Sequence, residues 1–367
     1  MDFIFLLVTY SIYLILGILM GFMPYLTRKT ESFGVTIPED TYYCQELRNM
    51  RKKYSLQAAL IYVPLTIGSI ILSFNAAEER ASLIYGIGLV LLIGLLFALY
   101  LKYHFQMKKF KSQKKWGEEK PKAIIIDTGF RNKKLTYSNA WFIIPTIIMM
   151  ATLAVTLVYF DRIPERIPLQ YNFSGEVTRW AEKSPRSVFW IPVQQLMMIG
   201  LFAFINYTIS RAKQQIDPSN PEKSLVQNQI FRLRWSAYII ATGTFMVLIF
   251  TVVQLSFIFN ISPQIVWSVP MVITALLVIG AAAISITTGQ GGSRVVVGDG
   301  TKREEIDKDD DKYWKLGQFY FNPNDPTIFL EKRFGIGWTI NFASIKAWLI
   351  LLGVIGLIIG IQFLFRV

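Results

Sequence analysis

The sequence predicts an all-α integral membrane protein with about eight transmembrane helices, a small cytoplasmic β-hairpin module and one extracytoplasmic loop. Three observations lead to this fold class: the composition, the long apolar runs and the uneven distribution of basic residues. Of the 367 residues, 53% are hydrophobic and only 17% are charged, whereas soluble domains carry about 25% charged residues. This composition excludes a disordered chain, a disulfide scaffold and an ordinary soluble enzyme.

Eight segments are long and apolar enough to cross a bilayer, which takes about 20 residues. They are 3–26, 56–74, 82–101, 141–160, 188–209, 233–259, 265–287 and 345–365. The second is the weakest because Pro64 interrupts it. The chain then divides into a three-span region with basic loops (1–140), a two-span unit (141–209), a helical hairpin (210–287), a cytoplasmic module (288–344) and a last helix (345–367).

Lysine and arginine in the connecting loops predict the orientation of these spans, because basic loops stay in the cytoplasm. Loops 27–55, 102–140, 210–234 and 288–344 together hold 30 such residues, whereas loops 75–81, 161–187 and 260–264 hold 6. We therefore expect a multi-pass protein of the cell membrane, with the basic loops inside and both termini outside.

The inventory of reactive side chains argues against an enzyme. One cysteine, Cys44, and one histidine, His104, cannot build an internal disulfide or a multi-histidine metal site. The motifs of zinc proteases and serine hydrolases are missing from the sequence, as is a pair of intramembrane aspartates. We expect no catalytic residue, no metal and no cofactor.

Two cytoplasmic loops suggest surface interactions. After Pro38, the stripe of Tyr43, Leu47, Met50 and Tyr54 has helical spacing and predicts a surface helix, which either binds a partner or lies under the bilayer. Further on, five lysines interleave with aromatic residues, a pattern that favours anionic lipid headgroups over nucleic acid. They are Lys108, Lys109, Lys111, Lys114 and Lys115. A small hairpin is expected over residues 123–137.

The last cytoplasmic loop contains three patterns. Its opening, Gly289 to Arg294, suggests either a backbone nest for an anion or, as we favour, a flexible exit from the span. The acidic run 307–311 lacks the glycine and glutamate of a calcium loop and predicts a solvated linker. Residues 313–341 predict a short β-hairpin module with aromatic anchors, which could contact a cytoplasmic protein partner. Its candidate residues are Trp314, Tyr320, Asn322, Trp338 and Asn341.

The only sizeable outer loop, 161–187, carries the candidate ligand site. Residues 170–173 should pair with 177–180 across the turn at Ser174 and Gly175. Prolines would stiffen the loop, while aromatic and basic side chains suit a peptide or a lipid; a plain structural cap is the other interpretation. The candidate ligand-binding residues are Pro164, Arg166, Pro168, Asn172, Gly175, Arg179, Trp180 and Lys183.

In this loop the chain resembles a bacterial membrane domain of unknown function that accompanies the Bacillus immunity proteins against a sporulation-delaying killing peptide. The matching residues are Pro164, Ile167, Pro168, Tyr171, Asn172, Gly175, Arg179, Trp180, Lys183 and Ser184. The family's usual histidine is Gln170 here. Residues 314–341 also resemble an uncharacterised domain seen in such proteins. The resemblance implies an envelope protein for immunity to, or sensing of, a membrane-active peptide.

Two function classes remain in competition, with a membrane enzyme as a third and weaker one. The first is a protein that binds or senses an extracytoplasmic peptide, lipid or envelope ligand, and immunity to a membrane-active peptide is one form of it. The alternative is a transporter of a small solute or lipid. Carriers usually place ionisable groups inside spans, and the main long polar groups within the predicted spans are instead Gln194, Gln195, Asn206 and Gln254.

Overall fold

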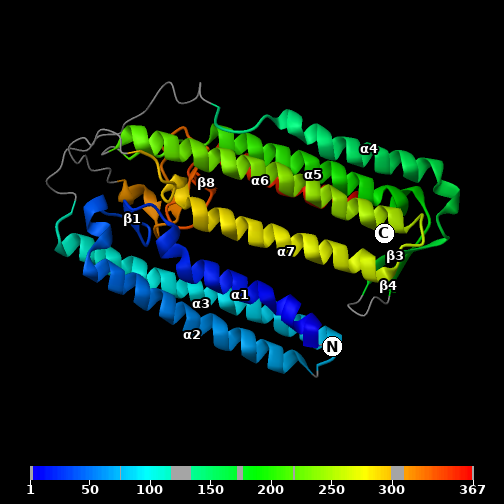
Figure 1. Ribbon diagram of the computed structural model, residues 1–367, viewed down its shortest axis with the longest axis horizontal. Helices are drawn as coiled ribbons and strands as arrows, with labels where there is room; N and C mark the ends of the chain where they lie inside the picture. Colours follow the sequence, from blue (N-terminus) through cyan, green and yellow to red (C-terminus); the bar gives the residue numbers. More distant parts are fainter. Residues whose placement is uncertain are drawn as a thin grey trace. The chain divides into compact units, whose positions relative to one another are not determined.

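The computed structural model describes residues 3–74, 76–116, 134–171, 177–217, 220–298 and 310–365. Within them lie eight α-helices that are long and apolar enough to span a membrane, and each overlaps one predicted span (Figure 1). The helices are α1 (Phe3–Leu26), α2 (Gln45–Phe74), α3 (Glu78–Gln113), α4 (Ile143–Val158), α5 (Pro185–Arg211), α6 (Pro221–Ser256), α7 (Pro263–Thr288) and α8 (Ile345–Leu364). Most of the hairpin expected over 123–137 lies outside the described residues.

The chain forms two compact units. The first comprises residues 1–130, 213–231 and 285–343, and the second comprises 131–212, 232–284 and 344–367. The first unit therefore contains α1 to α3 together with segments from each of the four loops that the charge count predicts to be cytoplasmic.

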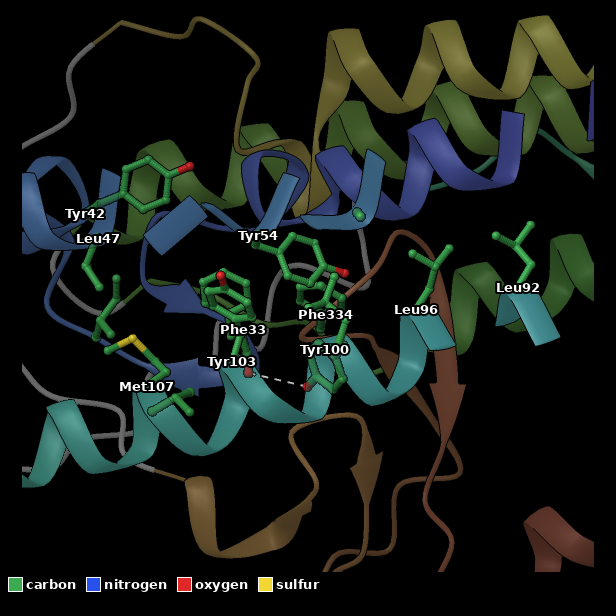
Figure 2. Close-up of a cluster of buried hydrophobic side chains, with 14 of the residues drawn as sticks. Phe33, Tyr42, Leu47, Tyr54, Leu92, Leu96, Tyr100, Tyr103, Met107 and Phe334 are labelled. Carbon is green, nitrogen blue, oxygen red and sulfur yellow. Dashed lines mark hydrogen bonds between the residues drawn. The ribbon is translucent and has the colours of Figure 1, made fainter. Parts of the chain in front are cut away.

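The three helices of the first unit pack side by side around aromatic residues (Figure 2). Glycine allows the closest approach, because a Cβ atom on Gly17 of α1 would lie 2.2 Å from the Cγ atom of Tyr62 on α2. Hydroxyl groups add hydrogen bonds between the helices: Tyr10 bonds to Ser73 at 2.8 Å, and Ser55 donates to the carbonyl of Gly21 at 2.8 Å. Small residues and hydroxyls are the usual means of packing apolar helices in lipid.

The surface helix predicted after Pro38 is wrong as a separate element. A short 3-10 helix, η1 (Glu39–Tyr43), is followed at once by α2, which begins at Gln45 and continues without a break through Pro64. Leu47 and Tyr54 are fully buried and Met50 packs against them, so these three residues of the stripe face the core of the first unit, whereas Tyr43 of η1 is exposed. The stripe is in phase with the span that follows it, and the helix therefore continues instead of turning to lie in the plane of a bilayer.

The second unit uses polar side chains to join its helices. Gln195 of α5 donates to the Thr251 hydroxyl of α6 at 2.9 Å, and Thr251 also bonds to Thr152 of α4 at 3.1 Å. One turn further along α6, Gln254 donates to the Thr156 hydroxyl at 3.1 Å. The long polar groups of α5 and α6 are thus built into contacts between helices.

Among the described residues of the first unit are six short strands, in three antiparallel pairs. The pairs are β1 (Glu31–Ser32) with β2 (Val35–Thr36), β5 (Trp314–Lys315) with β6 (Phe319–Tyr320), and β7 (Phe329–Glu331) with β8 (Trp338–Ile340). The sequence predicts one hairpin over 313–341, and the structure has two. The extra turn lies at Leu316 and Gly317, which have φ of 52° and 71°, a conformation that glycine adopts without cost.

The close approach at Gly17 predicts that a larger residue there destabilises the protein more than the same residue at a glycine with open space around it. Gly17→Leu should lower the midpoint of thermal unfolding in detergent by several degrees, because overpacking costs about 1–3 kcal/mol. Gly68→Leu on α2 is the matched control, since no atom lies within 4 Å of a Cβ atom placed there. Equal midpoints for the two variants would contradict the packing of α1 on α2.

Candidate functional site

The segment between α4 and α5 forms a two-stranded hairpin, as predicted. Strand β3 (Arg166–Tyr171) pairs antiparallel with β4 (Val177–Glu182), and the register places Pro168 opposite Trp180. The pairing begins at Arg166, four residues before the predicted start. We call residues 166–182 the α4–α5 hairpin; its tip, with the candidate residues Asn172 and Gly175, lies outside the described residues.

One face of the α4–α5 hairpin is anchored in an apolar cluster. Ile167 is fully buried and Ile163 is nearly so, and both pack with Val188 and Ile191 of α5 and with Phe257. Since side chains alternate across a strand, burial of Ile167 turns its neighbours outward. The hairpin is therefore fixed to the second unit through alternate residues.

The chain enters α5 directly from the hairpin through a helix cap. Ser184 accepts a hydrogen bond from the backbone N–H of Ser187 at 3.1 Å, and Ser187 accepts one in return from the N–H of Ser184 at 2.9 Å. The Lys183 amide donates to the Glu165 carbonyl at 2.8 Å. The Lys-Ser pair of the sequence pattern thus includes a capping residue, which ties the hairpin to the first turn of α5.

Several of the predicted ligand residues are accessible on or next to the hairpin. Trp180 is 52% exposed, and Pro164, Arg166 and Arg179 are also exposed. Pro168 is half-buried. The Lys183 ammonium lies 4.9 Å from the centre of the Phe160 ring, a distance that allows a cation–π contact. Four of the candidate residues are therefore accessible. Arg166 and Trp180 lie on the same face of the hairpin, whereas Arg179, the neighbour of Trp180 in β4, lies on the other face.

Four of the five candidate residues of the cytoplasmic module contact one another and are buried. They are Trp314, Tyr320, Asn322 and Asn341. We call residues 310–343 the strand module. The Asn341 amide donates to the carbonyls of Asn322 and Asp325 at 2.9 and 3.0 Å, and Tyr320 donates to the Asp325 carboxylate at 2.8 Å. Trp314 is buried against Tyr320. These side chains hold the turn between the two hairpins.

Trp338 is half-buried, and its ring centre lies 5.1 Å from that of Phe231 on the first-unit part of α6. Of the two predicted aromatic anchors, Trp314 lies in the core of the strand module and Trp338 lies against a helix.

The acidic run is not simply a solvated linker. Asp310 and Asp311 both pair with Arg333, which is only 1% exposed. Asp311 also binds Lys111 of α3 at 2.7 Å. Although burial acts to raise the pKa of Asp311, attraction to Arg333 and Lys111 outweighs it and holds that pKa well below its usual range. An unpaired buried arginine would be costly, and the two aspartates remove this cost. Residues 307–309 lie outside the described part of the chain.

Lys111 therefore differs from the other four lysines of the predicted headgroup cluster. It is buried and ion-paired, whereas Lys108, Lys109, Lys114 and Lys115 are exposed. The headgroup prediction applies to these four.

A second buried ion pair was not indicated by the sequence. Glu331 is fully buried and pairs with Arg28, which lies two residues beyond the end of α1. Asn228 of α6 donates to the same carboxylate at 2.7 Å, and Arg28 donates to the side chain of Gln215 at 3.0 Å. The four residues come from three distant loops, so no local pattern could have shown the site.

The glycine run after α7 is a structural contact, and the expected flexible exit is wrong. Gln290 is fully buried; its amide donates to the carbonyls of Lys332 and Gly337 at 2.9 and 3.0 Å and accepts from the Gly337 N–H at 2.8 Å. The glycine run is fixed to the strand module because the Gln290 side chain forms hydrogen bonds with three of its backbone groups.

Two family models match parts of the chain. A domain of unknown function, DUF1648, matches residues 147–196, which cover most of α4, the α4–α5 hairpin and the first part of α5. A family of unknown function, DUF5808, matches residues 323–348, which include β7, β8 and the start of α8. No curated protein and no solved structure matches the chain at a significant level. Both matches agree with the resemblance to uncharacterised domains, and neither description names an activity.

The buried arginine of the strand module gives a direct test of this site's structure. Arg333→Met should destabilise the module by about 3–5 kcal/mol, because two aspartates lose the charge that compensates them. We expect faster cleavage within 310–343 in limited proteolysis of the purified protein. Lys315→Met is the control, since Lys315 is an exposed lysine of the same module. Identical cleavage rates for the two variants would show that the ion pairs contribute nothing.

Proposed function

We propose that the eight helices cross a bilayer and that the basic loops lie in the cytoplasm. Contacts inside the first unit support this arrangement. Arg28, Lys111, Asn228 and Glu331 come from the four loops that the charge count groups together. Arg28 and Asn228 bind Glu331, and Lys111 binds Asp311, so each of the other three loops contacts loop 288–344. Alternate loops of a multi-pass protein must lie on the same side, and this clustering meets that requirement. The termini and the α4–α5 hairpin are then outside.

We infer that the α4–α5 hairpin binds an extracytoplasmic ligand, and Trp180 is the observation that carries this inference. A large aromatic side chain that is half exposed leaves apolar surface in water. Trp180 lies on a hairpin whose other face is already anchored, so the hairpin loses little conformational freedom when a ligand binds. Tryptophan and arginine side chains commonly dominate binding energy at interfaces, and Arg166 and Arg179 are exposed on the same hairpin.

The ligand that best fits this surface is an amphipathic, membrane-active peptide. Its apolar face would cover Trp180, and its acidic or carbonyl groups would meet the arginines. A peptide of this kind reaches the outer face of the bilayer at the depth of the hairpin. Immunity to such a peptide, or its sensing, is the biological form that the family resemblance suggests.

A transporter of a small solute or lipid is the second candidate, and one observation favours it. The Oε1 atoms of Gln195 and Gln254 are buried and have no hydrogen-bond partner among the described residues. Polar atoms inside spans can line a solute path. Against this, no charged side chain lies near the middle of any span in the described part of the chain.

The proposed orientation predicts which residues a membrane-impermeant maleimide reaches in intact cells. Single cysteines are placed at Lys115, Thr178 and Lys315 in a Cys44→Ser background. We expect labelling at position 178 alone in intact cells and at all three positions after permeabilisation. Labelling at 115 or 315 in intact cells would contradict the orientation, and with it the extracytoplasmic position of the hairpin.

The binding proposal predicts the effect of removing Trp180. Cells that express the protein are challenged with a panel of amphipathic membrane-active peptides, and binding of fluorescently labelled peptides to proteoliposomes is measured in parallel. Trp180→Ala should weaken binding by about tenfold or more, as loss of a central aromatic contact does. Lys183→Glu should abolish the protection of cells against the peptides. Pro168→Ala should reduce binding and protection by less than either of these substitutions.

Trp141→Ala is the matched control, because Trp141 lies in the 3-10 helix before α4 and is exposed to the same 52%. Insertion levels are compared for all variants. If Trp180→Ala and Lys183→Glu insert normally and keep full protection and binding, the hairpin is only a structural cap.

A further inference from the structure

An open cavity of about 390 Å³ lies within the second unit, where the segment before α4 meets the C-terminal end of α5. Its wall includes Lys134, Thr136 and Ser138 from that segment, and Asn206, Tyr207 and Ser210 from α5. Of the residues considered above, Asn206 lines this cavity, and none of the candidate ligand-binding residues of the α4–α5 hairpin does.

The cavity has a fixed floor. Asn206 is only 1% exposed; its amide donates to the Tyr137 carbonyl at 3.0 Å and to the Asn139 side chain at 2.7 Å. Its oxygen accepts from Ser236 of α6 at 2.6 Å, and the Ser236 hydroxyl accepts from the Tyr137 N–H at 2.9 Å. These bonds hold the segment in place, so the cavity exists before any ligand arrives.

The chemistry of the lining suits an anion with several oxygen atoms. Lys134 supplies a positive charge, and Thr136 and Ser138 supply hydroxyl groups that can donate, whereas the Ser210 hydroxyl donates to the Tyr207 carbonyl at 2.7 Å. Among the described residues, the lining contains no acidic side chain. Next to the cavity, the Arg211 guanidinium lies 5.3 Å from the centre of the Tyr207 ring. A phosphate group matches this set of donors and charges.

The surroundings identify the phosphate as part of a lipid. Below the cavity the first turns of α4 expose Ile143 and Ile147, at 58% and 60%, a surface that acyl chains can cover. Tyr137 and Tyr207 are 38% and 49% exposed, and tyrosines are enriched at the depth of the headgroups. The cavity also opens between two of the basic loops, on the side where anionic lipids are concentrated.

We propose that this cavity binds the headgroup phosphate of an anionic phospholipid of the cytoplasmic leaflet. The proposal rests on the membrane placement given above but not on the α4–α5 hairpin. Its test measures lipid binding in detergent, which depends neither on orientation nor on peptide binding. The two proposals can therefore fail separately.

Native mass spectrometry of the full-length protein in detergent tests the proposal. The protein is titrated with phosphatidylglycerol and phosphatidylcholine of the same acyl chains, and a third titration uses inorganic phosphate. We expect about fivefold tighter binding of phosphatidylglycerol, the effect of one well-placed cation near anionic lipid. Lys134→Gln should abolish this preference. Ser210→Trp keeps the charge but fills the cavity, and it should also abolish the preference.

Lys346→Gln is the matched control, because Lys346 is an exposed lysine of the second unit that follows a basic loop directly, and it should keep the preference. Circular dichroism checks the fold of each variant, and Lys134→Gln decides alone if Ser210→Trp does not fold. Equal binding of the two lipids by the wild type, or a retained preference in Lys134→Gln, would overturn the proposal. Displacement of phosphatidylglycerol by millimolar phosphate would show a free-anion site and would overturn the lipid assignment.

Discussion

The organisation of the first unit depends on two buried charged clusters. Glu331 and Arg333 are almost completely removed from solvent, and each is separated from its partners by hundreds of residues or by a loop. Breaking a buried ion pair on one side is strongly destabilising, because a charge is left without compensation. The pairing therefore requires α1, α3 and the strand module to be in place together. The ion pairs therefore hold the loops together at one end of the three apolar helices, and the short strands themselves contribute little.

The same constraint separates residues that look alike in sequence. Lys111 and Lys109 belong to one basic run, yet only Lys111 meets Asp311, because helical spacing turns the two side chains to different faces of α3. The acidic run behaves in the same way at Asp310 and Asp311. For Asp325, burial acts to raise the pKa, but hydrogen bonds from Lys213 and Thr327 lower it to about 2. Charges that suggest solvated surface in a sequence can thus be structural ties in the fold.

The helices could be predicted from the sequence, and the contacts between loops could not. A long apolar run predicts a helix because, in lipid, the backbone can form hydrogen bonds only within its own helix. The helix forms even where Pro64 interrupts the apolar run. The α4–α5 hairpin was predictable because its turn and its prolines are local. Glu331 and Arg28 meet across 303 residues of chain, and neither has a local pattern that distinguishes it from surface charge. The cavity at Lys134 was hidden for the same reason, since its floor is Asn206, a residue that the sequence presents only as a polar group in a span.

One of the polar groups within the apolar helices has a specific structural cause. Pro192 lies inside α5 and has no N–H, so the Val188 carbonyl four residues earlier loses its helical partner. The Gln254 amide of α6 donates to that carbonyl at 3.2 Å. A carbonyl left without a partner in hydrocarbon costs several kcal/mol, and a neighbouring helix is the usual remedy. Gln254 is therefore required by the proline, whether or not any solute passes. The hydrogen bond to Val188 accounts for the Gln254 amide nitrogen without a transport pathway. The same bond fixes α5 against α6 close to the hairpin that carries Trp180. The Gln254 amide is thus explained by the packing of α5 on α6.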